Sequence, residues 1–126
     1  MVDLHLHTTA SDGFLEPEEV VDRAHKAGIR NFSVTDHDTM AGVSAAAAAA
    51  SKLGLDCLPG IEITAVIDGR DVHVLGYFLE ISPPGLDLFL RAQRDDRIAR
   101  ARAMAEKLKA LGMPIPIDSI VESTKA

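Results

Sequence analysis

Apolar and polar positions repeat with two different periods along the first part of the chain. Residues 2–7 alternate as in a β-strand, and Leu4 and Leu6 are expected to lie buried behind its polar face. Residues 17–27 instead carry apolar side chains three and four positions apart, which predicts an amphipathic helix. A proline and acidic residues suit its first turn, and Gly28 ends it.

The alternation of strand and helix patterns then continues. Residues 29–34 form a short apolar run between turn signals, which predicts a second strand. Residues 40–53 contain a run of alanines with high helix propensity, and this predicted helix can be capped by Thr39 and ended by Gly54. With a further strand after it, this order predicts an α/β layer with a mostly parallel sheet.

The third strand region is followed by a hairpin signal. It covers residues 55–58 and 61–67, with an interruption at Pro59-Gly60. Asp68-Gly69 is a strong signal for a two-residue turn, because both residues tolerate positive φ. Residues 71–79 are therefore predicted to return antiparallel to the preceding strand.

Pro83-Pro84-Gly85 mark a change in pattern. We expect a boundary here, between a first part (residues 1–82) and a second part (residues 83–126). Residues 86–111 have helical spacing and would span roughly 39 Å at about 1.5 Å per residue, so we expect this helix to be kinked or split. Another helix is predicted to begin at Asp118.

Charge is distributed unevenly over the 126 residues, whose net charge is −6. Residues 1–90 hold 5 Lys or Arg against 14 Asp or Glu, which argues against binding of duplex DNA. Residues 91–109 are instead basic, with 7 Lys or Arg against 3 Asp or Glu. No signal peptide or membrane-spanning run is evident. The single cysteine, Cys57, suits a cytoplasmic protein.

Six side chains of metal-binding types lie at predicted strand ends or on strand positions that can face inward. They are His5, His7, Asp12, His37, Glu62 and His73. We interpret them as candidate metal ligands. The alternative to metal binding is a solvated polar face for the histidines, loop capping for Asp12 and a buried ion pair for Glu62. Two further acids, Asp36 and Asp38, could orient the ring of His37 or cap the following helix.

This set of imidazoles and carboxylates, without thiolates, suits Zn²⁺, Mn²⁺ or Fe²⁺. It offers more ligands than one tetrahedral ion needs, so two or three ions are predicted, with Glu62 as a bridging carboxylate. Closely spaced ions acidify a water and hold an oxyanion, which is the chemistry of phosphate ester hydrolysis. The chain has no nucleophile elbow and no Gly-rich phosphate loop.

The motifs resemble those of the polymerase and histidinol phosphatase (PHP) superfamily. The resemblance rests on four segments in order: His5-Leu6-His7-Thr8 with Ser11-Asp12-Gly13, Thr35-Asp36-His37-Asp38, Gly60-Ile61-Glu62, and His73-Val74-Leu75-Gly76-Tyr77. Within the superfamily, the chain is most similar to stand-alone bacterial phosphoesterases, including those acting on nucleoside 3′,5′-bisphosphates and on the 5′ ends of short RNA.

The resemblance implies the N-terminal half of a distorted (β/α)₇ TIM-like barrel, followed by the start of a helical insertion. It assigns His5, His7 and Glu62 to one ion, Glu62 and His73 to a second, and Asp12 and His37 to a third. It also implies that a metal-bridging hydroxide attacks phosphorus. The expected substrate is a small phosphorylated molecule, such as a nucleotide.

One departure from the family pattern concerns the later ligands. The family adds a further histidine and an Asp-x-His pair, whereas His73 is the last histidine here. We therefore expect a fragment of a longer protein, or a truncated form, that self-associates through an open barrel edge. A C–N hydrolase of the amidohydrolase type and a non-catalytic metal-binding fragment are the alternatives. A row of arginines on the long helix could contact substrate phosphates or form a solvated face: Arg91, Arg94, Arg97, Arg100 and Arg102.

Overall fold

The computed structural model describes residues 1–78 and 80–123. The chain forms two compact units, Met1–Pro84 and Gly85–Ala126. The first unit contains all six candidate ligands, and the second contains the long basic helix. Each unit is described below by itself.

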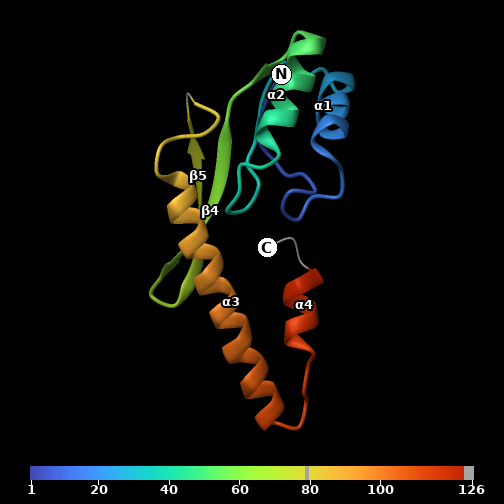
Figure 1. Ribbon diagram of the computed structural model, residues 1–126. Coiled ribbons are helices and arrows are strands. Elements are labelled where there is room, and N and C mark those ends of the chain that lie inside the picture. The colour runs from blue at the N-terminus through green and yellow to red at the C-terminus, as the bar shows by residue number, and fades with distance from the viewer. Residues whose placement is uncertain (79, 124–126) are drawn as a thin grey trace. The chain divides into compact units, whose positions relative to one another are not determined.

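The first unit is built on a small parallel sheet (Figure 1). Its strands are β1 (Val2–Leu6), β2 (Asn31–Val34) and β3 (Asp56–Cys57), in the order β1-β2-β3. Both strand pairs are parallel, so the predicted α/β architecture is confirmed. The pairing of β1 with β2 is irregular between Asp3 and Leu6.

Two helices connect these strands, α1 (Pro17–Lys26) and α2 (Val43–Leu53), and they pack against each other (Figure 1). The predicted start and end of α1 are confirmed: the backbone N–H of Glu16 donates to the Glu19 carboxylate, and Gly28 follows with φ 77°. The prediction that Thr39 caps α2 is wrong, because the Thr39 hydroxyl accepts from Ala41 N–H in a turn that precedes the helix.

The hydrophobic core lies between one face of the sheet and the two helices. Phe32 and Val34 of β2 are fully buried there, and the other members come from α1, α2 and the start of the third strand region: Val21, Ala46, Ala50 and Leu55. Because side chains alternate along a strand, Ser33 and Thr35 point to the opposite face. They are also fully buried, and their hydroxyl groups have no hydrogen-bond partner among the described residues.

The first strand is less buried than its pattern predicts. Leu6 packs against the core, but the side chain of Leu4 is 38% exposed, so the expectation that Leu4 is buried is wrong. β1 is an outer strand of the described sheet, and the irregular pairing shifts its register at this point. The strand therefore does not present its alternate residues evenly to the core.

A long hairpin completes the first unit. β4 (Gly60–Ile67) and β5 (Arg70–Tyr77) pair antiparallel over their whole length. Asp68 and Gly69 form the turn with φ 51° and 74°, as the sequence predicted. Contacts that tie the hairpin to the rest of the unit include a parallel bridge between His37 and Glu62, and a hydrogen bond from the Tyr77 hydroxyl to the Leu4 carbonyl oxygen at 2.9 Å.

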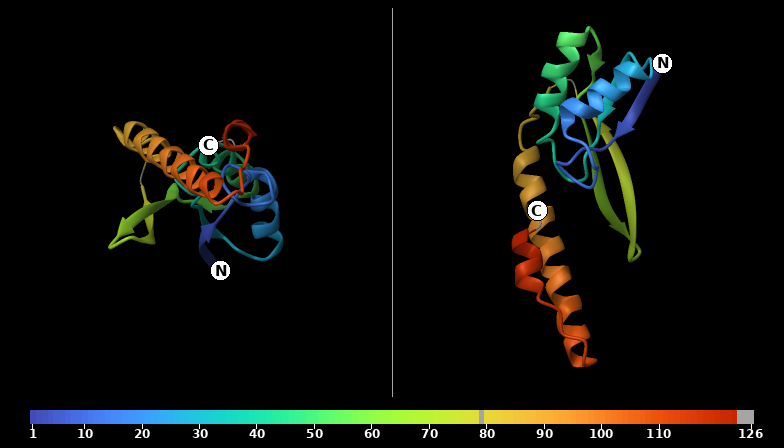
Figure 2. Two further views of the ribbon diagram at one scale, coloured as in Figure 1. Left: turned by 90° about the horizontal axis from the view of Figure 1, so that it is seen from below. Right: turned by 90° about the vertical axis from the view of Figure 1, so that its right-hand side faces the viewer.

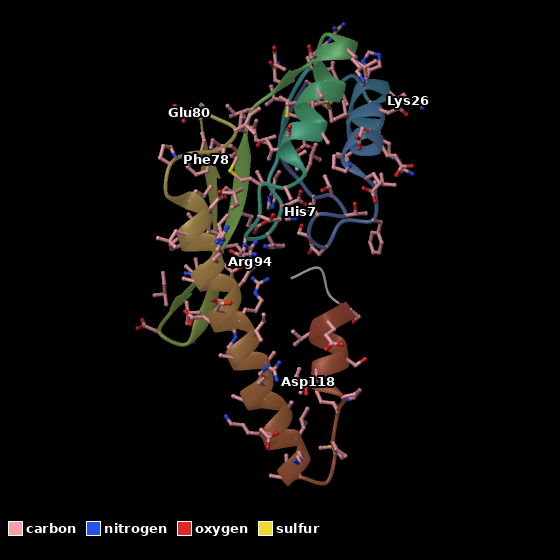
Figure 3. All side chains as sticks on the ribbon, viewed as in Figure 1. His7, Lys26, Phe78, Glu80, Arg94 and Asp118 are labelled. Atoms are coloured by element: carbon pink, nitrogen blue, oxygen red, sulfur yellow. The ribbon has the colours of Figure 1, made fainter. Side chains whose placement is uncertain are left out.

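The second unit consists of α3 (Leu86–Ala110) and α4 (Ile117–Ser123). α3 is one continuous helix of 25 residues, so the expectation that it is kinked or split is wrong (Figure 2). The start of α4 agrees with the helix predicted at Asp118, whose carboxylate faces α3 (Figure 3) and pairs with Arg102 at 2.6 Å. No helix among the described residues is long and apolar enough to cross a membrane.

Candidate metal centre

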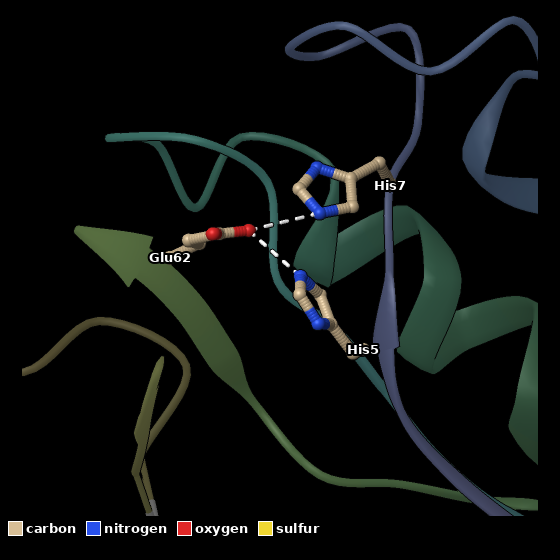
Figure 4. A group of neighbouring side chains, drawn as sticks. All are labelled: His5, His7 and Glu62. Atoms are coloured by element: carbon tan, nitrogen blue, oxygen red, sulfur yellow. Dashed lines mark hydrogen bonds and ion pairs between the residues drawn. The ribbon is translucent and has the colours of Figure 1, made fainter. Parts of the chain in front are cut away.

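His5, His7 and Glu62 converge on one point (Figure 4). The Nε2 atoms of His5 and His7 lie 2.8 and 3.0 Å from the same oxygen, Glu62 Oε2. The two histidines come from the end of β1, and Glu62 comes from β4. His5 and His7 lie two positions apart at the end of β1, so both imidazoles point to the same side of the strand. There they meet Glu62, which is far from them in the sequence.

Glu62 links this group to a second one. Its carboxylate is buried, and its other oxygen, Oε1, lies 2.7 Å from His73 Nδ1 on β5. His37 approaches the same carboxylate, with Nε2 at 3.8 Å from Oε2. His37, Glu62 and His73 therefore form a second set of side chains that could hold a metal ion. A carboxylate that faces separate nitrogen atoms with its two oxygens has the geometry of a bridging ligand.

Asp12 contributes a third group from the loop after β1. Its carboxylate lies 3.1 Å from His7 Nδ1 and 3.7 Å from His37 Nε2, and its side chain is 67% exposed. His7, Asp12 and His37 form a third set of potential ligands. The structure thus brings all six predicted ligands into three overlapping groups.

The overlap at His7 can be resolved by the chemistry of imidazole. A neutral ring offers one lone pair, and its other nitrogen carries a proton. If His7 Nε2 serves the group with His5 and Glu62, the Nδ1–H is left to donate to Asp12. Asp12 then remains available as a ligand together with His37. This division agrees with the assignment that the sequence resemblance implies.

The ring positions are compatible with bound metal ions as well as with hydrogen bonds. Metal–nitrogen and metal–oxygen bonds are about 2.0–2.2 Å long, so two donors on one ion lie roughly 3 Å apart. The Nε2–Oε2 distances of 2.8 and 3.0 Å agree with this value. Neighbouring imidazole rings also lie close together, with centroids 4.8–5.1 Å apart.

The charges of the site lower the pKa of both carboxyl groups. Burial acts to raise the pKa of Glu62, but the hydrogen bonds from His5 and His73 and the charge of His37 outweigh it and lower the pKa below its ordinary value. Asp12 behaves in the same way: burial acts to raise its pKa, and His37, Ser11 and His7 lower it overall. Both groups are therefore held in the anionic form that binds metal cations.

Asp38 holds the strand that carries Glu62. Its backbone N–H donates to the Glu62 carbonyl at 2.8 Å, and its carboxylate accepts from Thr64 N–H at 2.9 Å. It has φ 51°, a left-handed backbone conformation that is uncommon for residues other than glycine. Through these bonds the segment after β2 continues beside β4, which places His37 next to Glu62.

Asp36 holds the loop that carries Asp12. It is fully buried and accepts hydrogen bonds from Thr8 and Ser11. Neither Asp36 nor Asp38 hydrogen-bonds the far nitrogen of His37, because His37 Nδ1 has no partner among the described residues. Orientation of the His37 ring by one of these acids stays a prediction, and the bonds described here show both acids holding neighbouring segments of the chain.

Thr8 and Ser11 are the residues of the site that the sequence did not single out for a role. Both lie in the polar loop directly after His7, and their hydroxyl groups could have been recognised as partners for a buried acid. Nothing in the sequence indicates that this acid is Asp36, because the two segments are separated by 28 residues. Only the folded chain brings them together.

Curated proteins of known function are similar to this chain. A 5′–3′ exoribonuclease of Haemophilus influenzae is 38% identical over 92% of this chain and 42% of its own length. A 3′,5′-nucleoside bisphosphate phosphatase of Chromobacterium violaceum is also 38% identical, over 89% of this chain and 39% of its own. This chain therefore spans about two fifths of the length of these curated relatives.

A solved structure is also similar to this chain over nearly its whole length, and a family model matches most of the chain. A protein of Bifidobacterium adolescentis named as a metal-dependent phosphoesterase superposes with a TM-score of 0.79 and 35% identity, over 98% of this chain and 43% of its own. The family model of the PHP domain matches residues 3–100, which include all six predicted ligands. The chain belongs to the PHP domain family, as an N-terminal part of it.

Proposed function

We propose that this chain provides the N-terminal part of a metal-dependent phosphoesterase site that hydrolyses phosphate monoesters of nucleotides or of short RNA 5′ ends. The observation that carries the proposal is the convergence of four histidines on the buried Glu62 and on Asp12. The relatives named as an exoribonuclease and a bisphosphate phosphatase support the substrate class.

We propose that the site holds two or three divalent ions, such as Mn²⁺, Fe²⁺ or Zn²⁺. His5, His7 and Glu62 would hold one, Glu62 and His73 a second, and Asp12 and His37 a third. Such ions would supply the acidification of water and the charge that binds phosphate oxygens. The chain's own contribution is the placement of the donor atoms: Glu62 joins two groups, and the His7 Nδ1–H orients Asp12.

The same proposal extends to the whole protein. In this view residues 1–82 are half of a distorted (β/α)₇ barrel, and residues 83–126 begin a helical insertion. The outer position of β1 supports self-association through an open edge. The expected location is the cytoplasm, where the single Cys57 would stay reduced.

Metal binding is the first test. The chain is titrated with Mn²⁺ and with Zn²⁺ after removal of metal, and bound metal is counted by elemental analysis. We expect wild-type chain to bind more than one ion and Glu62→Gln to lose most of this binding. Glu18→Gln is the matched control, because Glu18 is exposed on α1 outside the site and its change should leave binding unaltered. A wild-type chain that binds no divalent metal would contradict the proposal.

Substrate class is the second test. The metal-loaded chain is assayed for release of phosphate from nucleoside monophosphates and 3′,5′-bisphosphates, with amide substrates in parallel. Phosphate release that is abolished by Glu62→Gln and kept by Glu18→Gln supports the phosphoesterase. Amide cleavage in its place would favour a C–N hydrolase. Tight metal binding with no turnover of either class would agree with a fragment that binds metal but lacks the later ligands of the family.

A further inference from the structure

The carboxylate of Asp36 is satisfied entirely from one short loop. Thr8 N–H and the Ser11 hydroxyl both donate to Oδ1 at 2.7 Å, and the Thr8 hydroxyl donates to Oδ2, also at 2.7 Å. Asp36 is fully buried, where short hydrogen bonds to a charged acceptor are strong and hard to replace. The side chain of Asp36, which follows β2, thus holds both ends of the Thr8–Ser11 segment.

This segment carries two candidate ligands at its ends. Thr8 directly follows His7, and Ser11 directly precedes Asp12. The Ser11 hydroxyl lies 2.7 Å from Asp36 but 3.2 Å from Asp12, so its single proton is best placed for Asp36. Asp12 itself is largely exposed, and among the contacts given above only the two histidines and Ser11 reach it. Its position therefore depends on how the loop is anchored.

The surroundings of Asp36 are shaped for this contact. A Cβ at Gly42 would lie 2.9 Å from both Asp36 Oδ2 and the Thr8 hydroxyl, so the start of α2 leaves room only for glycine beside the pair. The main chain of Asp36 faces the other way and accepts from Glu62 N–H at 3.2 Å. One residue thus connects the loop that carries Asp12 with the strand that carries Glu62.

We propose that Asp36 is a positioning residue, which clamps the Thr8–Ser11 loop and thereby sets the metal affinity of the group formed by Asp12 and His37. This rests on the proposed function, in that the group is taken to bind metal. Asp36 touches neither substrate nor metal in this role. It sets the position of Asp12 through its hydrogen bonds with Thr8 and Ser11.

The first experiment compares Mn²⁺ affinities of variants. Asp36→Asn and Thr8→Val remove parts of the clamp, and Thr8→Ser keeps the hydroxyl that donates to Asp36. Asp12→Asn identifies the class of sites that depends on Asp12. We expect Asp36→Asn and Thr8→Val to weaken that class about tenfold or more, with the other class within about twofold of wild type, and Thr8→Ser to restore it. Asp56→Asn, an exposed acid on β3, is the control.

A role in folding alone would give a different pattern. It would lower the melting temperature and weaken every class of metal site together, or would leave the Asp12-dependent class at wild-type affinity. Equal losses for Thr8→Ser and Thr8→Val would show that the hydroxyl is irrelevant. Either result would overturn the proposal.

The second experiment needs no metal and separates this proposal from the proposed function. Amide hydrogen exchange is measured by NMR on the metal-free chain. We expect the amides of Thr8 and Gly13, both bonded within the clamped loop, to exchange about tenfold faster or more in Asp36→Asn, and helix α2 to be unchanged. If wild-type chain binds no metal, the proposed function fails while this measurement still reports the clamp. Unchanged exchange at Thr8 and Gly13 would overturn the clamp itself.

Discussion

Glu62 is a buried acid surrounded by bases, and its ionisation should be visible in the stability of the metal-free chain. Because its pKa in the folded chain is lowered from 4.5, its ionised form stabilises the folded state. That contribution is present above the unfolded pKa and is lost as the pH falls through the folded pKa. The site thus makes the fold sensitive to acid.

We therefore expect the free energy of unfolding of wild-type metal-free chain to fall as the pH drops below about 4.5. Glu62→Gln should show a smaller fall over the same interval, since it has no carboxyl group to protonate there. Urea unfolding between pH 6 and pH 3 measures both. Parallel pH profiles for the two proteins would contradict the assignment of this effect to Glu62.

Gly60 marks a close approach between β4 and β2. A Cβ at this position would lie 2.2 Å from Ser33 Oγ and 2.9 Å from Thr35 Cγ2, and both of these residues are fully buried. We expect Gly60→Ala to destabilise the fold by about 1–3 kcal/mol through overpacking. Gly76→Ala is a matched control on β5, because its Cβ would meet its nearest atoms at 3.5 Å. Thermal unfolding that ranks the control as equally unstable would contradict this reason.

At the residue scale, the sequence predicted which six side chains come together but not the residues that hold them in place. The six ligand types could be found because histidines and acids at strand ends are visible in the sequence as a pattern. The roles of Asp36 and Asp38 could not, because their partners Thr8 and Thr64 are 28 and 26 positions away. Such contacts depend on tertiary packing, which no local pattern encodes.

The hairpin β4–β5 is the element that delivers His73 to Glu62. Its register pairs Thr64 with His73 and Glu62 with Leu75, so the turn at its far end decides which side chains meet. Asp68 and Gly69 both have positive φ, which defines a turn that matches the twist of the strands. The turn is thus part of the site's construction, although it lies at the opposite end of the hairpin.

We expect Gly69→Ala to destabilise the first unit by about 1–2 kcal/mol. The cause is the left-handed backbone at φ 74°, because no atom lies within 4 Å of the added Cβ. Asp68→Asn is the control, since asparagine tolerates this conformation well and should change stability little. Urea unfolding of both variants tests the difference. Equal stability of Gly69→Ala and wild type would show that the turn does not constrain the hairpin.

At the element scale, the sequence predicted features that depend on local backbone preferences, and it failed for features that depend on packing against other elements. The proline and glycine limits of α1 and the Asp68-Gly69 turn follow from backbone preferences. Leu4 is exposed because β1 is an outer strand with irregular pairing. The long α3 is continuous because its sequence contains no proline or glycine to bend it, although length alone suggested a break.

At the scale of the whole molecule, a single aromatic reporter distinguishes the two units. The chain has one tyrosine and no tryptophan, and Tyr77 lies in the first unit with its hydroxyl bonded to Leu4. Tyrosine fluorescence therefore reports the unit that contains the candidate metal centre. The helical signal in circular dichroism has a large contribution from α3, in the second unit.

We expect Mn²⁺ to raise the unfolding midpoint seen by Tyr77 fluorescence and EDTA to reverse the change. Binding to the folded state alone adds about 2.7 kcal/mol at a ligand concentration 100 times Kd. Glu62→Gln should remove most of this gain, and Glu18→Gln should keep it. A midpoint that does not respond to metal in the wild-type chain would contradict a preformed site in the first unit.

The alternation of β2 has a consequence for how this protein can change in length. Phe32 and Val34 face the core while Ser33 and Thr35 face the opposite side, and the next residues in the same phase lead to His37. Inserting or deleting one residue in this strand would exchange the two sets, so a single event would spoil both the core and the site. Evolution and protein engineering can therefore vary β2 in the identity of its side chains but not in its length.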